Sequence, residues 1–202
     1  MMKIHDISQE VYTCKVFPGD PAPQKEILAK ISDGEVCNVT AFRMCAHNGT
    51  HVDAPYHFYN EGKKVGDISL KNFVGMAYVA EHTGEISGED AIEILEKARD
   101  ADPRSAKRLL MKGQAVVTLA AAEVFAEAGI LLYGNESQTV GPEDAPKEVH
   151  LKMLGADMVL LEGIRLSEIS EGVYLLNAAP IHLGEADGAP CRAILLSEVG
   201  LE

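Results

Sequence analysis

The amino-acid sequence predicts an α/β fold, in which helices interleave with short apolar strands. Apolar runs of strand length alternate along the chain with helix patterns. No internal repeat, low-complexity tract or Ser/Gly-rich linker divides the sequence. The length of 202 residues suits one domain with its own core. We therefore expect residues 1–202 to form a single domain.

Seven strands are expected, each from a run of apolar and β-branched residues that turn signals bound. The first run contains Val, Thr and Phe, and it leads into a segment with the turn signals Asn48-Gly49 and Ala54-Pro55. The expected strands lie within residues 36–46, 76–80, 109–111, 130–133, 158–161, 173–176 and 193–196.

Three helices are expected between these strands, each with recognisable start and stop residues. The first has Ser as its N-cap, the second is rich in Ala, and the third begins with Pro. The expected spans are 88–99 (Ser87 to Asp102-Pro103), 118–128 (Thr118 to Gly129) and 146–154 (Pro146 to Gly155).

Composition and charge exclude two classes of partner. The net charge of −13 argues against nucleic acid, because binding a phosphate backbone needs clustered Lys and Arg. No apolar run approaches the roughly 20 residues that span a bilayer, and the N-terminus has no apolar signal stretch. The four scattered cysteines, without a Cys-x-x-Cys pair, indicate free thiols. We therefore expect a cytoplasmic protein with neither a nucleic-acid nor a membrane partner.

Three residues of metal-ligand type lie within seven positions, at His47, His51 and Asp53. A straight strand would separate residues 47 and 53 by about 20 Å, at roughly 3.3 Å per residue, which is too far for ligands of one ion. The turn signal Asn48-Gly49 supplies a bend that returns His47 toward His51, and Asp53 shares a strand face with His51. The alternative is that these are polar residues with ordinary surface or core partners.

Two later residues are candidates for completing a metal site. His150 lies on the third expected helix, and Glu162 follows directly after the apolar run 158–161. A carboxylate that ends a buried strand is unfavourable unless it is paired or bound to a cation. Taken alone, His150 is better explained as a helix-surface residue and Glu162 as a solvated strand end.

The segment HNGTHVDAPYHF, residues 47–58, resembles the signature of the cyclase family, which includes bacterial kynurenine formamidases and isatin hydrolases. Every fixed position of the pattern H-x-G-T-H-x-D-x-P-x-H is matched. The likeness extends along nearly the whole chain through four further stretches. These are Asp6-Ile-Ser8, Phe17-Pro-Gly-Asp20, Leu70-Lys-Asn-Phe-Val-Gly75 and Gly188-Ala-Pro-Cys-Arg192.

The resemblance implies a layered α/β fold of the swivelling β/β/α type that assembles into homodimers or homotetramers. It also implies one or two divalent ions per chain, with zinc ahead of manganese. By matched position, His57 is the catalytic residue. Apart from the resemblance, Phe17 is the aromatic that we expect to bind the substrate, ahead of Tyr56, Phe58 and Phe73, whose alternative role is core packing. The implied metal ligands are His47, His51, Asp53, His150 and Glu162.

Two departures from the family pattern concern the expected wall of the pocket. Phe17 stands where the formamidases often have Trp, and Gly134-Asn135-Glu136-Ser137 replaces the Gly-x-Asp that relatives often show. Because of these departures, the sequence identifies neither the exact substrate nor the roles of Asn135, Glu136 and Ser137.

The residues also suit metal-assisted hydrolysis apart from any family. A divalent ion lowers the pKa of water toward about 7 and polarises a carbonyl, and His57 is placed to give a proton to a leaving nitrogen. The leading hypothesis is a metal-dependent amidohydrolase that acts on N-formylkynurenine or a similar aryl formamide, a small-molecule amide. The alternatives are hydrolysis of a cyclic amide or lactone, and a metal-binding protein without turnover. The alternative roles for His57 are those of an additional metal ligand or of a structural histidine.

Overall fold

A curled nine-stranded sheet forms the centre of the molecule in the computed structural model, which describes residues 1–198. Its strands are β1 (Lys3–Asp6), β4 (His51–Asp53), β5 (Val74–Glu81), β7 (Arg108–Lys112), β9 (Leu132–Asn135), β10 (Val159–Glu162), β11 (Gly172–Asn177), β12 (Gly188–Pro190) and β13 (Ile194–Ser197). Their order across the sheet is β1-β13-β11-β5-β7-β9-β10-β4-β12. The central strands β5, β7, β9 and β10 run parallel, whereas the strands on both flanks pair antiparallel.

Two small sheets and the helices surround this sheet. β2 (Gln24–Ala29) pairs with β3 (Val39–Arg43), and β6 (Gly84–Ile86) pairs with β8 (Ala115–Val117). The α-helices are α1 (Leu70–Phe73), α2 (Gly88–Ala101), α3 (Leu119–Glu127) and α4 (Lys147–Gly155). Single 3-10 turns lie at η1 (Val11–Thr13), η2 (Ile31–Asp33), η3 (Pro55–His57), η4 (Val65–Asp67) and η5 (Ser105–Lys107). No helix within residues 1–198 combines the length and apolarity needed to span a membrane.

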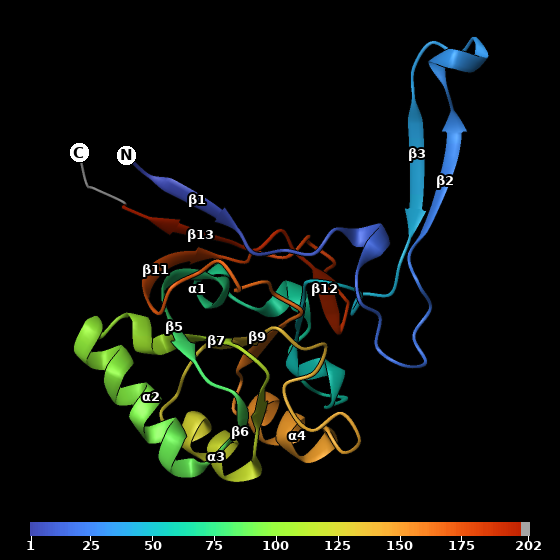
Figure 1. Cartoon of the computed structure of the whole chain (residues 1–202). Helices are drawn as coiled ribbons and strands as arrows, with labels where there is room; N and C mark the ends of the chain where they lie inside the picture. Colours follow the sequence, from blue (N-terminus) through green and yellow to red (C-terminus); the bar gives the residue numbers. More distant parts are fainter. Residues whose placement is uncertain (199–202) are drawn as a thin grey trace.

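Side chains of the central strands alternate between two apolar cores. In β5, Tyr78 and Ala80 belong to the core beneath α2, α3 and α4, which cover one face of the sheet (Figure 1). Ala77 and Val79 belong to the core on the opposite face, which side chains from the flanking strands β11 and β13 also enter. Because both faces of the central strands are buried, these strands read as continuous apolar runs in the sequence.

The three longer helices confirm the helix predictions, with small differences at their ends. Ser87 begins α2 with a reciprocal capping box, and Thr118 caps α3. α2 runs two residues beyond the predicted end. α4 is displaced by one residue, because Pro146 is its N-cap and Gly155 is its last residue rather than its stop. The left-handed residue that follows this helix is Asp157, with φ of +60°.

All seven predicted strands are present, although their boundaries differ. In the first predicted run, residues 39–43 form β3, whereas residues 36–38 lie in the connection before it. The run 130–133 contains only the start of β9, which begins at Leu132. The remaining strands, β1, β2, β4, β6, β8 and β12, are not predicted. They are three to six residues long, and all except β8 contain polar residues, Gly or Pro, so that no continuous apolar run marks them in the sequence.

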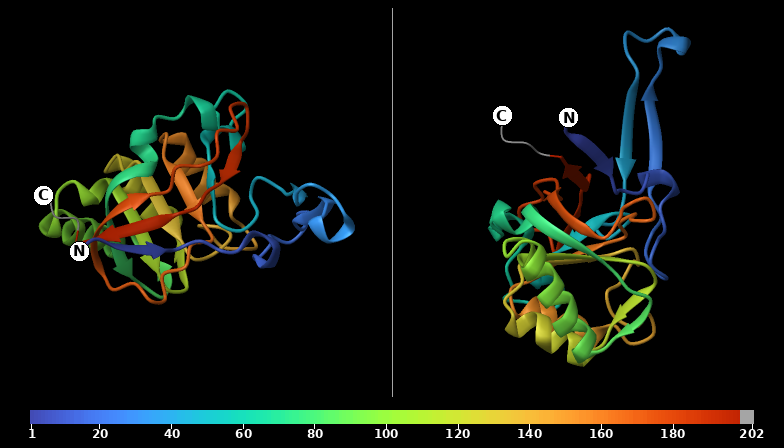
Figure 2. Two further views of the ribbon diagram at one scale, coloured as in Figure 1. Left: turned by 90° about the horizontal axis from the view of Figure 1, so that it is seen from above. Right: turned by 60° about the vertical axis from the view of Figure 1, so that its left-hand side comes forward.

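The β2–β3 hairpin projects from the rest of the molecule (Figures 1 and 2). We call this segment, residues 24–43, the arm. Its two strands pair only with each other among the strands of residues 1–198. The arm leaves the body next to the functional site, because β3 is followed after three residues by His47.

A buried arginine ties the central sheet to α1. Arg108, at the start of β7, is 7% exposed. Its guanidinium donates to the carbonyl oxygens of Asn72 at 3.1 Å, Met76 at 3.3 Å and Lys71. Carbonyl groups at a helix end have no partner within the helix, so the guanidinium satisfies groups that would otherwise be buried unpaired.

We expect Arg108→Met to lower the free energy of unfolding by about 3 kcal/mol, because an unpaired buried polar group costs roughly 1–3 kcal/mol. Urea denaturation followed by circular dichroism measures this change. Arg99→Met, which alters an exposed arginine of α2, is the matched control. A loss no larger than that of the control would show that the three carbonyls find other partners.

Candidate metal centre

Strands β4 and β10 carry the centre of the site. They pair antiparallel, so that His51 lies opposite Glu162 and Asp53 lies opposite Leu160. Val52 between the two β4 residues belongs to the core on the far face of the sheet. Strand alternation therefore turns His51, Asp53 and Glu162 toward the face that the helices cover.

Hydrogen bonds to the backbone orient two histidines of this cluster. Nδ1 of His51 donates to the Gly49 carbonyl at 3.0 Å, and Nδ1 of His150, on α4, donates to the Pro146 carbonyl at 2.8 Å. Each ring then offers Nε2 to the cluster. The Nε2 atoms of His51 and His150 lie 3.6 Å and 3.3 Å from carboxylate oxygens of Glu162. Two ligands of one ion have separations of this kind when each lies about 2.0–2.2 Å from it.

The chemistry of this donor set fits a divalent cation. His51, Asp53, His150 and Glu162 are each 3% exposed or less. Nitrogen lone pairs and carboxylates that face one another in such a buried space need a proton or a cation between them. Burial and the charge of Asp53 raise the pKa of Glu162. Imidazole nitrogens combined with carboxylate oxygens are the ligands that zinc and related ions prefer.

A tight bend brings His47 back to the same cluster. Gly49 has φ of +67°, a conformation that favours glycine, and the rings of His47 and His51 lie 5.1 Å apart. This geometry confirms the predicted bend. Both ring nitrogens of His47 meet carboxylates: Nδ1 lies 2.7 Å from Asp53, and Nε2 lies 2.9 Å from Asp187. Burial opposes a positive charge on His47, but these partners outweigh it and raise the pKa of His47 to about 11.

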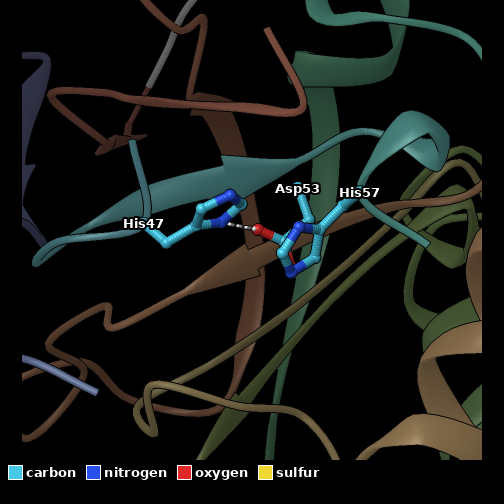
Figure 3. A group of neighbouring side chains, drawn as sticks. All are labelled: His47, Asp53 and His57. Atoms are coloured by element: carbon cyan, nitrogen blue, oxygen red, sulfur yellow. Dashed lines mark hydrogen bonds and ion pairs between the residues drawn. The ribbon is translucent and has the colours of Figure 1, made fainter. Parts of the chain in front are cut away.

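His57 lies next to His47 and Asp53, on η3 directly after β4 (Figure 3). Its ring stacks on the ring of His47 with centroids 4.1 Å apart, and its Nδ1 lies 3.2 Å from Asp187. The side chain of His57 is 30% exposed, compared with 14% for His47 and 4% or less for His51 and His150. His57 is therefore the histidine of the cluster that is most open to a ligand from solvent.

Among residues 1–198, two groups of three residues have ligand atoms close enough to hold an ion, and both include Asp53. One group is His47, Asp53 and His57, and the other is His51, Asp53 and Glu162. His150 adjoins the second group through Glu162. All six residues that the sequence predicts for metal binding and catalysis thus lie in one cluster.

Asp187 is a site residue that the sequence analysis does not predict. It lies directly before β12, and it accepts hydrogen bonds from both His47 and His57. These two bonds hold the pKa of the Asp187 carboxyl well below its usual range. The sequence signal that could have identified Asp187 is its position directly before Gly188, where the closing stretch of the family pattern begins.

A cavity of about 260 Å³ opens over the cluster. Phe17 lies in its wall, as predicted, and Phe58 lies there as well, with its ring stacked on that of His150 at 4.8 Å. Gln138 and Thr139 add polar groups to the same wall. Within residues 1–198, the Gln138 Oε1 and Thr139 Oγ1 atoms have no hydrogen-bond partner.

Residues 135–137, which the sequence analysis places in the wall of the pocket, lie outside this lining. The Asn135 side-chain amide donates to the Thr139 carbonyl at 2.9 Å. The Glu136 carboxylate accepts from the backbone amides of Gly113 and Leu166. These contacts shape the loop that presents Gln138 and Thr139, so the polar wall begins at Gln138 rather than at Asn135.

Comparison with known proteins identifies the family of this chain. Residues 5–142 match the model of the family described as "Putative cyclase". The kynurenine formamidase of Bacillus cytotoxicus is 31% identical over 204 residues, covering 94% of this chain and 95% of the relative. The kynurenine formamidase of Salinibacter ruber is 32% identical over 210 residues, covering 96% and 97%.

Solved structures share the fold. Isatin hydrolase A from Labrenzia aggregata, bound to benzyl benzoate, superposes with a TM-score of 0.82 at 19% identity, covering 96% of this chain and 93% of that one. A predicted metal-dependent hydrolase from Bacillus stearothermophilus gives a TM-score of 0.80 at 24% identity, covering 98% and 100%. Because the family model spans more than half of the chain and the formamidases match it nearly from end to end, this chain belongs to the cyclase family.

Proposed function

We propose that the protein is a metal-dependent amidohydrolase that hydrolyses N-formylkynurenine or a similar aryl formamide to the free arylamine and formate. The observation that carries this proposal is the buried cluster of imidazole nitrogens and carboxylates at the base of a cavity. The similarity to kynurenine formamidases over nearly the whole chain supports the substrate class. We propose that residues 1–202 form one hydrolase domain.

The ligands that we propose for one or two divalent ions are His47, His51, Asp53, His150 and Glu162. When bound, a divalent ion activates water for attack and polarises the carbonyl of the formyl group. Asp53 belongs to both groups of ligand residues, which supports its role as the bridge between two ions. The nitrogen-rich donor set favours zinc over manganese, which prefers oxygen ligands.

His57 is the residue that we propose to move the proton. Hydrolysis of an aryl formamide breaks the C–N bond, and the departing nitrogen must gain a proton to leave as an amine. The exposure of His57 and its place beside His47 support delivery of that proton from its ring. The Asp187 carboxylate binds Nδ1 of His57 and so fixes the orientation of the ring.

The cavity provides groups that suit a single aromatic ring carrying polar substituents. Its volume of about 260 Å³ lies near the lower end of small-molecule pockets, which span roughly 300–1,000 Å³. We assign Phe17 to the substrate aryl ring, with Phe58 facing the same cavity. Gln138 and Thr139 line the same cavity and bring a side-chain amide and a hydroxyl to its polar wall.

The test is turnover of N-formyl-L-kynurenine by protein loaded with zinc and, separately, with manganese. We expect hydrolysis in the zinc-loaded enzyme and its near-complete loss in His57→Ala. Isatin, a cyclic amide, is the comparison substrate, because the fold is shared with isatin hydrolase A. Turnover of isatin alone would move the function to cyclic amides. Bound metal without turnover of either compound would favour a metal-binding protein.

We also propose that the protein assembles into a homodimer or homotetramer. The support for this assembly on the molecule itself is the arm, whose exposed apolar surface is unusual for a chain that acts alone.

A further inference from the structure

Three carboxylates line the cavity over the cluster, and histidines engage two of them. Asp53 and Glu162 lie 2.7 Å and 3.3 Å from histidine nitrogens of the cluster. The third is Asp20, whose side chain is partly buried. Within residues 1–198 its only polar side-chain contact is with the Cys45 thiol, 3.8 Å away. In this part of the chain, the Asp20 carboxylate therefore has no ion-pair partner.

The proposed metal ions do not account for Asp20 either. It belongs to neither of the two groups of residues, within 1–198, whose ligand atoms lie close enough together to hold an ion. A carboxylate that is partly removed from water interacts more strongly with a cation than a fully solvated one does, because the effective dielectric constant is lower. Asp20 is thus a negative group in the cavity wall that neither the cluster nor its ions use.

A tight turn holds Asp20 next to Phe17, the residue that we assign to the substrate ring. The Asp20 amide donates to the Phe17 carbonyl at 3.0 Å, and Gly19 between them has φ of +102°, a conformation that favours glycine. Both side chains line the cavity. A ring that packs against Phe17 therefore brings its substituents to the part of the wall that carries Asp20.

The charge of the cavity wall decides which substituents it accepts. Within residues 1–198, no Lys or Arg lines this cavity. An anionic substituent beside Asp20 would face a like charge with no basic side chain to offset it. An ammonium group offers three donors, and its hydrogen bond to a carboxylate is roughly twice as strong as one between neutral groups. The wall therefore favours a cationic substituent.

We propose that Asp20 binds a positively charged substituent of the substrate, so that the site selects aryl formamides that carry an ammonium group. This inference rests on the proposed function, because it assigns a role within the hydrolysis of aryl formamides. Asp20 determines specificity and takes no part in breaking the C–N bond. N-formylkynurenine meets the requirement, since its side chain carries a primary ammonium group.

The experiment compares N-formyl-L-kynurenine with its desamino analogue, in which hydrogen replaces the ammonium group and the rest of the molecule is unchanged. Zinc-loaded wild type should prefer the first compound. Asp20→Asn should lower the ratio of the two kcat/KM values by about 10-fold or more, because a hydrogen bond to a charged group is worth at least this factor. The change should appear in KM for N-formyl-L-kynurenine rather than in kcat, because the ammonium group is remote from the reacting bond.

Two further variants separate binding of the charge from support of the turn. Asp20→Lys should reverse the preference, because the desamino analogue keeps its carboxylate and lacks the ammonium group that a lysine repels. Asp100→Asn, which removes the same charge from an exposed position on α2, is the matched control and should keep the wild-type ratio. Circular dichroism of each variant checks that the fold is retained. An equal effect of Asp20→Asn on both compounds would show that Asp20 only supports the turn, and would overturn the proposal.

Binding of the two products, L-kynurenine and its desamino analogue, extends the test to a readout that needs no turnover. Isothermal titration calorimetry should show tighter binding of L-kynurenine to wild type, and loss of this preference in Asp20→Asn. A wild-type protein without the preference would also overturn the proposal. If wild type hydrolyses neither formamide but shows an Asp20-dependent preference for L-kynurenine, the proposed function fails and the role of Asp20 stands.

Discussion

Asp53→Asn is expected to abolish tight binding of divalent ions and, with it, hydrolytic activity. Asp53 is 1% exposed and belongs to both groups of candidate ligands, so its loss removes a donor from each ion at once. Removing a residue that only supports a ligand already costs 10–100-fold in metal affinity, so loss of a shared ligand should cost well over about 100-fold. An amide cannot replace the carboxylate, because it brings no negative charge to the histidines and cations around it.

Metal content per chain, measured after dialysis of zinc-loaded protein, tests this expectation. The control is Asp157→Asn, an exposed aspartate with φ of +60°, a conformation that Asn also adopts readily. A second measurement is thermal unfolding with and without zinc. A ligand that binds only the folded state stabilises it by about 4 kcal/mol at a thousand times its Kd, so wild type should gain stability and Asp53→Asn should not. Full retention of metal by the variant would remove Asp53 from the site.

Local patterns explain why most of the site can be predicted from the sequence. His47, His51 and Asp53 lie within seven residues, and the bend between the two histidines depends on one glycine with positive φ. The position of Glu162 follows from strand alternation and from the register that sets it opposite His51. Helix ends are equally local, since Ser87 and Thr118 cap the helices that their positions predict.

Residues that join the site from distant strands leave no such pattern. Asp187 reaches His47 across 140 positions in the sequence, through a three-residue strand that has no periodicity of its own. Thr139 and Gln138 face the cavity because of the loop that Glu136 anchors to two backbone amides. Neither contact can be derived without the order of the strands in the sheet, which tertiary packing decides.

The arm shows a different limit of sequence patterns. Residues 39–43 have the composition of a strand and form one, but composition does not tell whether a strand is covered by its own chain. The exposure of Phe42 and Val39 became visible only with the fold.

His57→Ala is expected to lower kcat for aryl formamide hydrolysis by about 10²–10⁴-fold while the bound metal is retained, because a positioned proton donor contributes a factor of this size. The ring of His57 is the most exposed of the clustered histidines, and its Nδ1 is held by Asp187 rather than by a carboxylate of the buried cluster. Loss of the ring therefore removes the proton donor and leaves the four most buried donor residues in place.

Three measurements on one preparation distinguish this role from that of a ligand: kcat, metal content, and the response to added imidazole. If His57 transfers the proton, imidazole should restore part of the activity, because it enters the space that the side chain leaves and carries the same acid. His182→Ala, which alters an exposed histidine outside the cluster, should match wild type in all three. Loss of one ion per chain from His57→Ala would instead make His57 a ligand in the group that it shares with His47 and Asp53. In that case the proton must come from another group at the cavity.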